Sequence, residues 1–162
     1  MVSLYVRNSG GVNIILTTRN SRDKAELWIY HGQDLFNMAM ILTGSANQEA
    51  DENKRGIWYI SALGKCRQAV ENSLKAVIIL NAGAEPPKMR DLNTLASLAG
   101  LLSRMSAEQI DLLSDLTPYE EYEMGIGDLD TLKAAGDKDV YDAYFPMIEE
   151  LLSWISGLVT AG

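Results

Sequence analysis

Apolar positions recur every three or four residues through most of the chain, which is the period of an amphipathic helix. The first such segment is expected to begin at Ser21, a suitable N-cap, and to end at Gly44, because glycine favours the position just past a helix. Its apolar side is predicted to consist of Leu27, Trp28, His31, Leu35, Met38 and Leu42. A polar loop over residues 45–53 is expected to follow.

The second and longest predicted helix runs from about Lys54 to Asn81. Its first half is charged on one side, whereas the stretch from Ala76 to Leu80 is apolar all round. A helix segment that is apolar on every side is typical of one surrounded by neighbours. Gly83 is predicted to end this helix in the left-handed conformation, and two prolines that follow prevent its continuation.

Two further helices are predicted before a long connection. One covers residues 88–103, and the next starts at Ser106, where Gln109 three residues later can complete a capping box. This helix is expected to stop before Pro118. The connection over residues 117–136 is longer than a compact bundle normally needs, and long loops of this kind are often functional.

The last predicted helix covers residues 137–158, with Asp137 as its N-cap. Pro146 is expected either to kink it or to mark its true start. Residues 1–20 differ from the rest, because β-branched residues flank a Ser-Gly-Gly turn signal. The sequence therefore predicts an all-α fold, an up-and-down bundle of about five helices over residues 21–162. Residues 1–20 are predicted to be a short extension that forms a β-hairpin or is partly disordered.

Composition narrows the classes of function. The chain has 162 residues, enough for one domain with a real core, and a formal net charge of -8, which disfavours nonspecific binding to nucleic acid. Its one cysteine, Cys66, indicates a reducing compartment. No apolar run approaches the roughly 20 residues that a membrane helix needs. We therefore expect a cytoplasmic protein that does not act at a membrane.

The residues that carry chemistry are few. His31 is the only histidine, so a histidine-rich metal site, a Ser-His-Asp triad and a Cys-His dyad are all disfavoured. His31 is more typical of a packed residue than of a base, and Cys66 of a small buried residue than of a nucleophile. No glycine-rich phosphate loop is present. We expect no catalytic residue of a standard type, no bound metal and no cofactor.

One stretch resembles a known family. The second predicted helix and its exit contain a Gln-Ala-hydrophobic-Glu-x-x-Leu-Lys-Ala run that leads through a Gly and Pro turn to an Asp-Leu helix start. The matching residues are Gln68, Ala69, Val70, Glu71, Leu74, Lys75, Ala76, Gly83, Pro87, Lys88, Asp91 and Leu92. Trp28, Asp34, Leu35 and Ala39 agree with the opening pattern of the same family. Over about residues 22–102, the chain resembles the HEPN domain family (higher eukaryote and prokaryote nucleotide-binding).

This resemblance implies a helical domain that forms homodimers and often partners a minimal nucleotidyltransferase in toxin-antitoxin or stress modules. Many members are metal-independent ribonucleases, in which an arginine is followed four to six residues later by a histidine. The present chain departs from that motif, because Arg19 and Arg22 precede His31 at the wrong spacing. Arg90 also stands where the family usually has histidine before Asp-Leu. We therefore expect no RNA cleavage by the usual route.

The functional prediction is a noncatalytic HEPN-like module that binds a partner protein or itself, with nucleotide or RNA as further candidate ligands. The candidate ligand-binding residues are Arg67, Glu71, Lys75, Arg90 and Asp34. A simpler interpretation is that Arg67 and Lys75 only neutralise Glu71, and that Arg90 is a surface charge. The alternative function is a divergent HEPN ribonuclease or nucleotide-processing enzyme that uses Arg67 and Arg90 with carboxylates in place of histidine. An enzyme needs these groups in one cleft, whereas a binding module needs an exposed apolar face.

Overall fold

The computed structural model describes residues 10–161, with side chains from residue 20 onward. Over this range the chain is all-α, which confirms the predicted fold class. The elements are α1 (Gly10–Gln48), α2 (Glu52–Ala82), α3 (Leu92–Leu98), η1 (Leu102–Arg104), α4 (Ala107–Leu116), α5 (Tyr119–Glu123), α6 (Leu129–Ala135) and α7 (Lys138–Thr160). None of the described helices has the length and hydropathy required to span a bilayer.

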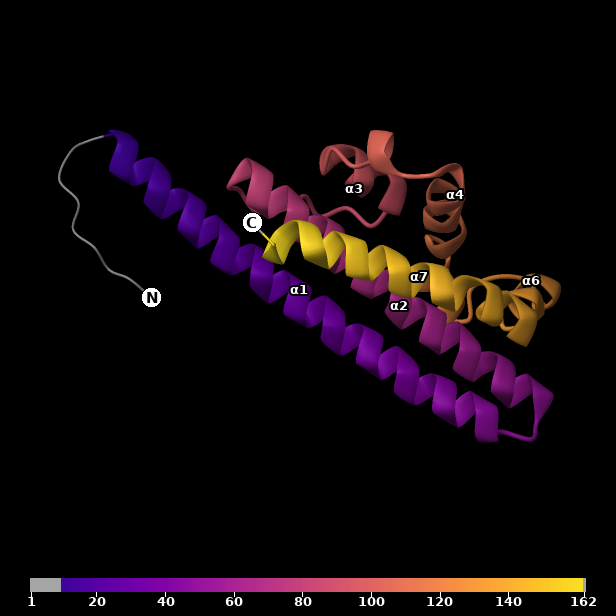
Figure 1. Cartoon of the computed structure of the whole chain (residues 1–162). Helices are drawn as coiled ribbons and strands as arrows, with labels where there is room; N and C mark the ends of the chain where they lie inside the picture. The colour runs from indigo at the N-terminus through magenta and orange to yellow at the C-terminus, as the bar shows by residue number, and fades with distance from the viewer. Residues whose placement is uncertain (1–9, 162) are drawn as a thin grey trace.

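The two longest helices, α1 and α2, form an antiparallel pair, and the last helix lies along it (Figure 1). Their connection is only residues 49–51, and Asp51 caps α2 by accepting a hydrogen bond from the Lys54 backbone N–H at 3.0 Å. The pairing of α1 with α2 is the most extensive interface in the molecule, followed by that of α2 with α7. The short helices α3, α5 and α6 pack against α2, so α2 is the central element.

The side of α1 that faces the bundle carries a row of small residues beside the large buried residue Ile29. Ala25, Gly32, Ala39 and Ala46 recur every seven residues, and all four are buried. A Cβ on residue 32 would lie 3.1 Å from Ser73 Oγ and 3.2 Å from the Ala69 carbonyl oxygen, so α1 approaches the α2 backbone closely here. This close approach determines which side of α1 is inside.

The predicted apolar side of α1 is therefore partly wrong. Leu27 and Met38 are 58% and 46% exposed, and His31 is exposed as well. The other three predicted residues, Trp28, Leu35 and Leu42, are half-buried at the edge of the interface. The physical reason is that small side chains allow the helix axes to approach, which buries more backbone and neighbouring atoms than a stripe of larger side chains held farther away.

The ends of α1 also differ from the prediction. Ser21 and Gly44 lie inside this helix rather than at its ends, and the predicted loop shrinks to three residues. The predicted hairpin is absent from residues 10–20, which are helical, and its remaining part, residues 1–9, lies outside the described range. Extending an existing helix adds one hydrogen bond for each residue that is fixed, so local turn and strand signals can be overridden.

The prediction for α2 is confirmed at both ends to within two residues. Gly83 adopts the left-handed conformation, with φ 66°, and its N–H donates to the Ile79 carbonyl at 2.9 Å. The residues from Ala76 to Ile79 are all buried, and Leu80 is half-buried. The apolar back half of this helix is therefore the centre of the bundle, as its sequence indicates.

The predicted helix over 88–103 is shorter and interrupted. It starts only after Asp91, whose carboxylate accepts a hydrogen bond from the Thr94 N–H, and it ends at Leu98. Gly100, with φ 73°, then turns the chain into η1. The next helix has the predicted capping box, in which Ser106 and Gln109 bond to each other's backbone N–H. The helical recurrence of apolar residues does not predict that the helix is interrupted at Gly100.

The connection over residues 117–136 is not a plain loop, since it contains α5 and α6. Asp137 caps α7 as predicted, by accepting a hydrogen bond from the Asp139 N–H at 2.7 Å. This helix continues through Pro146, so the proline does not mark its start. Its residues Ile148, Leu151, Ile155 and Val159 are fully buried and complete the core.

Candidate functional site

A buried ionic network lies on one side of α2. The Glu71 carboxylate bridges two cations one turn away in each direction: Arg67 Nη1 lies 3.2 Å from Oε1, and Lys75 Nζ lies 3.6 Å from Oε2. Arg67 is only 3% exposed. Lys75 Nζ also lies 5.8 Å from the centre of the Trp28 ring, within range of a cation–π interaction. The predicted pairing of Glu71 with both cations is therefore present.

Three of the five candidate ligand-binding residues meet in one pocket. Arg67, Glu71 and Arg90 line a pocket of about 350 Å³, together with Glu120 and Glu123. Lys75 forms an ion pair with Glu71 but does not line this pocket. Asp34 is exposed on α1 and does not line it either, although its neighbour Leu35 does. We call this the inner pocket.

Glu123 in the inner pocket was not identified from the sequence. Its side chain is 19% exposed, and Oε2 lies 3.5 Å from Lys65 Nζ. The carboxylate lies directly over Gly64 of α2, where any Cβ would overlap it. Burial raises the pKa of Glu123 above its usual value, and Lys65 and Arg67 act against this rise. A glycine inside a long helix was the available sequence signal, because it often marks a close approach.

Two buried polar atoms around this pocket have no hydrogen-bond partner within the described part of the chain. They are Arg67 Nε, a donor, and Glu123 Oε1, an acceptor. Buried polar atoms in folded proteins are nearly always satisfied. Both atoms are enclosed by protein, and Glu123 Oε1 lies against the backbone of α2 at Gly64.

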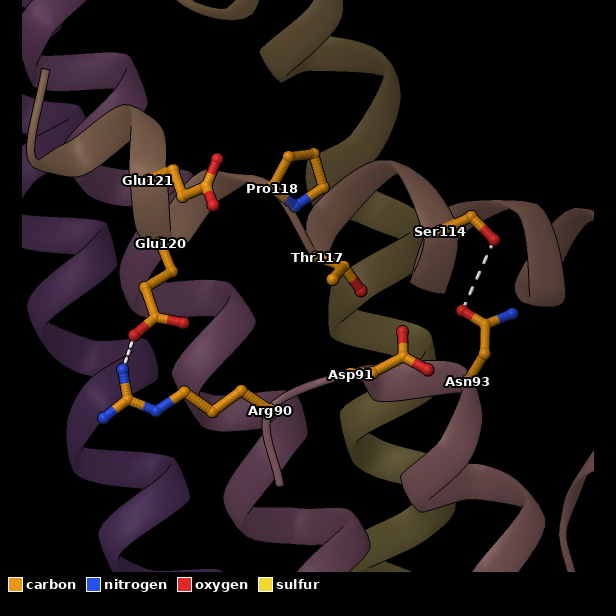
Figure 2. Close-up of a pocket in the computed structure, with 8 residues that line it drawn as sticks. All are labelled: Arg90, Asp91, Asn93, Ser114, Thr117, Pro118, Glu120 and Glu121. Carbon is orange, nitrogen blue, oxygen red and sulfur yellow. Dashed lines mark hydrogen bonds and ion pairs between the residues drawn. The ribbon is translucent and has the colours of Figure 1, made fainter. Parts of the chain in front are cut away.

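A second pocket of about 470 Å³ adjoins the first, and we call it the outer pocket (Figure 2). Arg90 and Glu120 line both pockets and form an ion pair with each other. The outer pocket also contains two further carboxylates, Asp91 and Glu121. On its other side, Ser114 Oγ donates to Asn93 Oδ1 at 3.3 Å. Together the two pockets form one groove, which we call the α2–α5 groove.

The charged groups that line the groove are guanidinium groups and carboxylates. His31 lines neither pocket. Cys66 is buried, and burial raises the pKa of its thiol to about 12, so it remains protonated. Within the described residues, no three His, Cys, Asp or Glu side chains are placed to hold a metal ion. Carboxylates and guanidinium groups in this arrangement can form hydrogen bonds and ion pairs with a polar ligand.

Comparison with known proteins places the chain in one family. A model of the HEPN domain matches residues 33–156, which include α2, the groove and most of α7. No curated protein and no solved structure matches the chain. The match spans far more than half of the 162 residues, and its helical fold agrees with the structure. The chain therefore belongs to the HEPN domain family.

Proposed function

We propose that this protein is a noncatalytic HEPN module that acts by binding a partner protein or a second copy of itself. The observation that supports this proposal is the outer side of α1. Leu27, Tyr30, Met38 and Ile41 are 58%, 57%, 46% and 71% exposed. We call these four residues the α1 stripe.

The spacing of the α1 stripe makes it one surface. Its members are separated by three, eight and three residues, so they lie along one side of the helix. The buried small residues, such as Gly32 and Ala39, lie on the opposite side. A surface helix normally has a single apolar side, which faces its own core. A second apolar side on α1 favours a helix that packs against another chain.

Of the candidate ligand-binding residues, we assign Arg67, Glu71 and Arg90 to ligand contact, because they share the inner pocket. Lys75 holds Glu71 in position from behind. Asp34 belongs to the outer side of α1, between Tyr30 and Met38, and a polar residue inside an apolar helix interface commonly sets its register. We propose this role for Asp34 in place of a ligand contact.

The second candidate is a divergent ribonuclease or nucleotide-processing enzyme. One observation favours it, since Arg67, Arg90 and the Glu71 carboxylate lie in the same pocket. Both guanidinium groups are paired with carboxylates, however, which leaves less positive charge to hold a phosphate. We therefore place this function second.

The experiment is to measure the mass of the purified chain by light scattering over a range of concentrations, and to incubate it with single-stranded RNA. We expect a species of twice the chain mass of 17.8 kDa and intact RNA. Ile41→Asp should yield the monomer, whereas Leu98→Asp, an equally polar change at a 55% exposed residue of α3, should not. RNA cleavage that is lost in Arg90→Ala would overturn the proposal. A monomeric wild type would exclude self-association and leave a partner protein as the occupant.

A further inference from the structure

The outer side of α1 has the same order of polar and apolar residues in both directions along the helix. The residues on this side recur at spacings of three and four. In chain order they are Asn20, Asp23, Leu27, Tyr30, Asp34, Met38, Ile41, Ser45 and Gln48. Two polar residues at each end flank two apolar residues, and Asp34 lies at the centre. Helical spacing places these residues on one side, but it does not require their polarity to be mirrored.

Turning the helix end for end about Asp34 therefore replaces each residue with one of the same kind. Leu27 and Ile41 lie seven residues from Asp34 on either side, and Tyr30 and Met38 lie four residues from it. A two-fold axis makes this exchange in a symmetric dimer, in which residue i contacts residue j of the partner and j contacts i. The α1 stripe can thus pack antiparallel to that of a second copy, with every apolar residue facing an apolar one.

The outer side of α1 is open to such a contact. Within the described residues, α1 packs mainly against α2 and α7, and Figure 1 shows both on the same side of it. The four side chains of the α1 stripe are between 46% and 71% exposed. A different partner protein could bind an apolar side of any order, so it would not require the mirrored one. The symmetry of the pattern therefore favours a second copy of this chain.

The mirrored order also favours one orientation. A parallel pair of helices brings identical residues together whatever their order is, so it would not require a mirrored pattern either. Only the antiparallel pair needs matching residues at equal distances on both sides of a centre. The antiparallel pair also places the opposite ends of the two helix dipoles side by side.

We propose that two copies of this chain associate through the α1 stripe in antiparallel orientation, with the two-fold axis at Asp34. This inference rests on the proposed function, and it specifies the occupant of the α1 stripe and its direction. Leu27 of one copy then contacts Ile41 of the other, and Tyr30 contacts Met38.

Asp34 opposes this association, because each copy brings a carboxylate to the axis. It forms no ion pair with another side chain of residues 20–161 that could neutralise it. Two like charges that approach within a few ångströms repel each other. Both helices lie at the surface, where water screens the charges, so the repulsion lowers the affinity without preventing contact. Asp34 thus keeps the association weak.

The first test introduces single cysteines and measures disulfide formation on a nonreducing gel after mild oxidation. Asp34→Cys places two thiols at the axis, so a covalent species of twice 17.8 kDa should form. Leu27→Cys alone should not cross-link, because its two copies lie about 21 Å apart along the helices, whereas a mixture of Leu27→Cys and Ile41→Cys should. Gln33→Cys, exposed on α1 outside the α1 stripe, is the control, and the native Cys66 is buried.

The second test measures the dimer dissociation constant by sedimentation equilibrium. Asp34→Asn keeps the size of the side chain and removes the repulsion, so it should tighten the dimer about fivefold or more. The matched control Asp111→Asn removes the same charge at an exposed position of α4 and should leave the constant within twofold. A merely structural role for Asp34 would not make its removal strengthen the dimer.

Three results would overturn the inference. They are cross-linking of Leu27→Cys to itself as fast as to Ile41→Cys, cross-linking of Asp34→Cys no faster than that of Gln33→Cys, and an Asp34→Asn dimer no tighter than wild type. A dimer that Ile41→Asp dissociates would still support the proposed function in each case, with a different orientation. A monomeric wild type would overturn the inference and leave a partner protein as the occupant of the α1 stripe.

Discussion

Gly136→Ala tests how closely α6 is held against α2. Gly136 ends α6 with φ -93° and ψ 8°, a conformation that alanine adopts without strain. A Cβ there would lie 2.6 Å from the Gly56 carbonyl oxygen and 2.9 Å from the Gly56 carbonyl carbon and Cα. These are backbone atoms in the first turns of α2, so they cannot rotate away as a side chain would.

The expected change in the free energy of unfolding is the sum of two opposing effects. Forcing an extra methyl group into a packed contact costs about 1–3 kcal/mol. Replacing glycine with alanine also restricts the unfolded chain, which returns about 0.4–1 kcal/mol of stability. We therefore expect Gly136→Ala to lower the free energy of unfolding by about 1–2 kcal/mol. For a chain of this size, each kcal/mol corresponds to about 2–4 °C in Tm.

The contact between Gly136 and Gly56 also provides a control variant, in which the alanine is placed at Gly56. A Cβ on Gly56 would lie 3.7 Å from the Gly136 carbonyl oxygen, an ordinary van der Waals distance. Because Gly56 lies within a helix, Gly56→Ala should raise stability by up to about 1 kcal/mol. Urea denaturation followed by circular dichroism measures both changes. The reasoning is refuted if Gly136→Ala is as stable as wild type, or if both variants lose stability equally.

Three further predictions concern charged and reactive groups. Arg67→Met should lower the free energy of unfolding by about 3 kcal/mol in urea titrations, because it removes the buried partner of Glu71, whereas the exposed Arg90→Met should change it by less than about 1 kcal/mol. Glu123→Gln should stabilise the fold at neutral pH, because the raised pKa means that ionised Glu123 costs stability there. This gain should shrink as pH falls through the raised pKa towards the ordinary value, where wild-type Glu123 is protonated in both states; a gain independent of pH would contradict the assignment. Cys66 should fail to react with Ellman's reagent at mildly alkaline pH in the folded protein, given its pKa of about 12, and should react fully once the protein is denatured.

The sequence predicts the helices well wherever a local chemical signal marks their ends. Gly83 and the Ser106–Gln109 capping box act through backbone hydrogen bonds within a few residues, so their effect can be read from neighbours alone. Ser21 and Gly44 carry similar signals but lie inside α1. These two signals do not end the helix, because tertiary packing extends it past them. Tertiary packing cannot be predicted from a local sequence pattern.

A hydrophobicity pattern does not predict the inner side of α1, because it ranks side chains by polarity and not by size. Leu27 and Met38 are more apolar than Ala25 and Gly32, yet the small residues face the bundle. Their exact seven-residue recurrence was the signal that could have identified this side. The local spacing predicts a shared face for Arg67, Glu71 and Lys75, since i,i+4 residues on a helix are neighbours.

The meeting of Arg67 with Arg90 and Glu123 could not be predicted from spacing. It depends on how the segment after α2 and the short helix α5 return to α2, which is a long-range property of the fold. Glu123 is one of several glutamates in an acidic stretch, and nothing local distinguishes it. The contact with Gly64 becomes visible only in three dimensions.

The order of the helices along the chain has a consequence for synthesis on the ribosome. The most extensive interface joins α1 and α2, which are consecutive and separated by three residues, so this hairpin can form while the rest of the chain is still being made. The helix that covers it, α7, is the last of the described elements to be synthesised. Until then, the surface around Ile29 and Phe36 stays uncovered in the nascent chain, and exposed apolar surface of this kind makes an incomplete chain prone to aggregate.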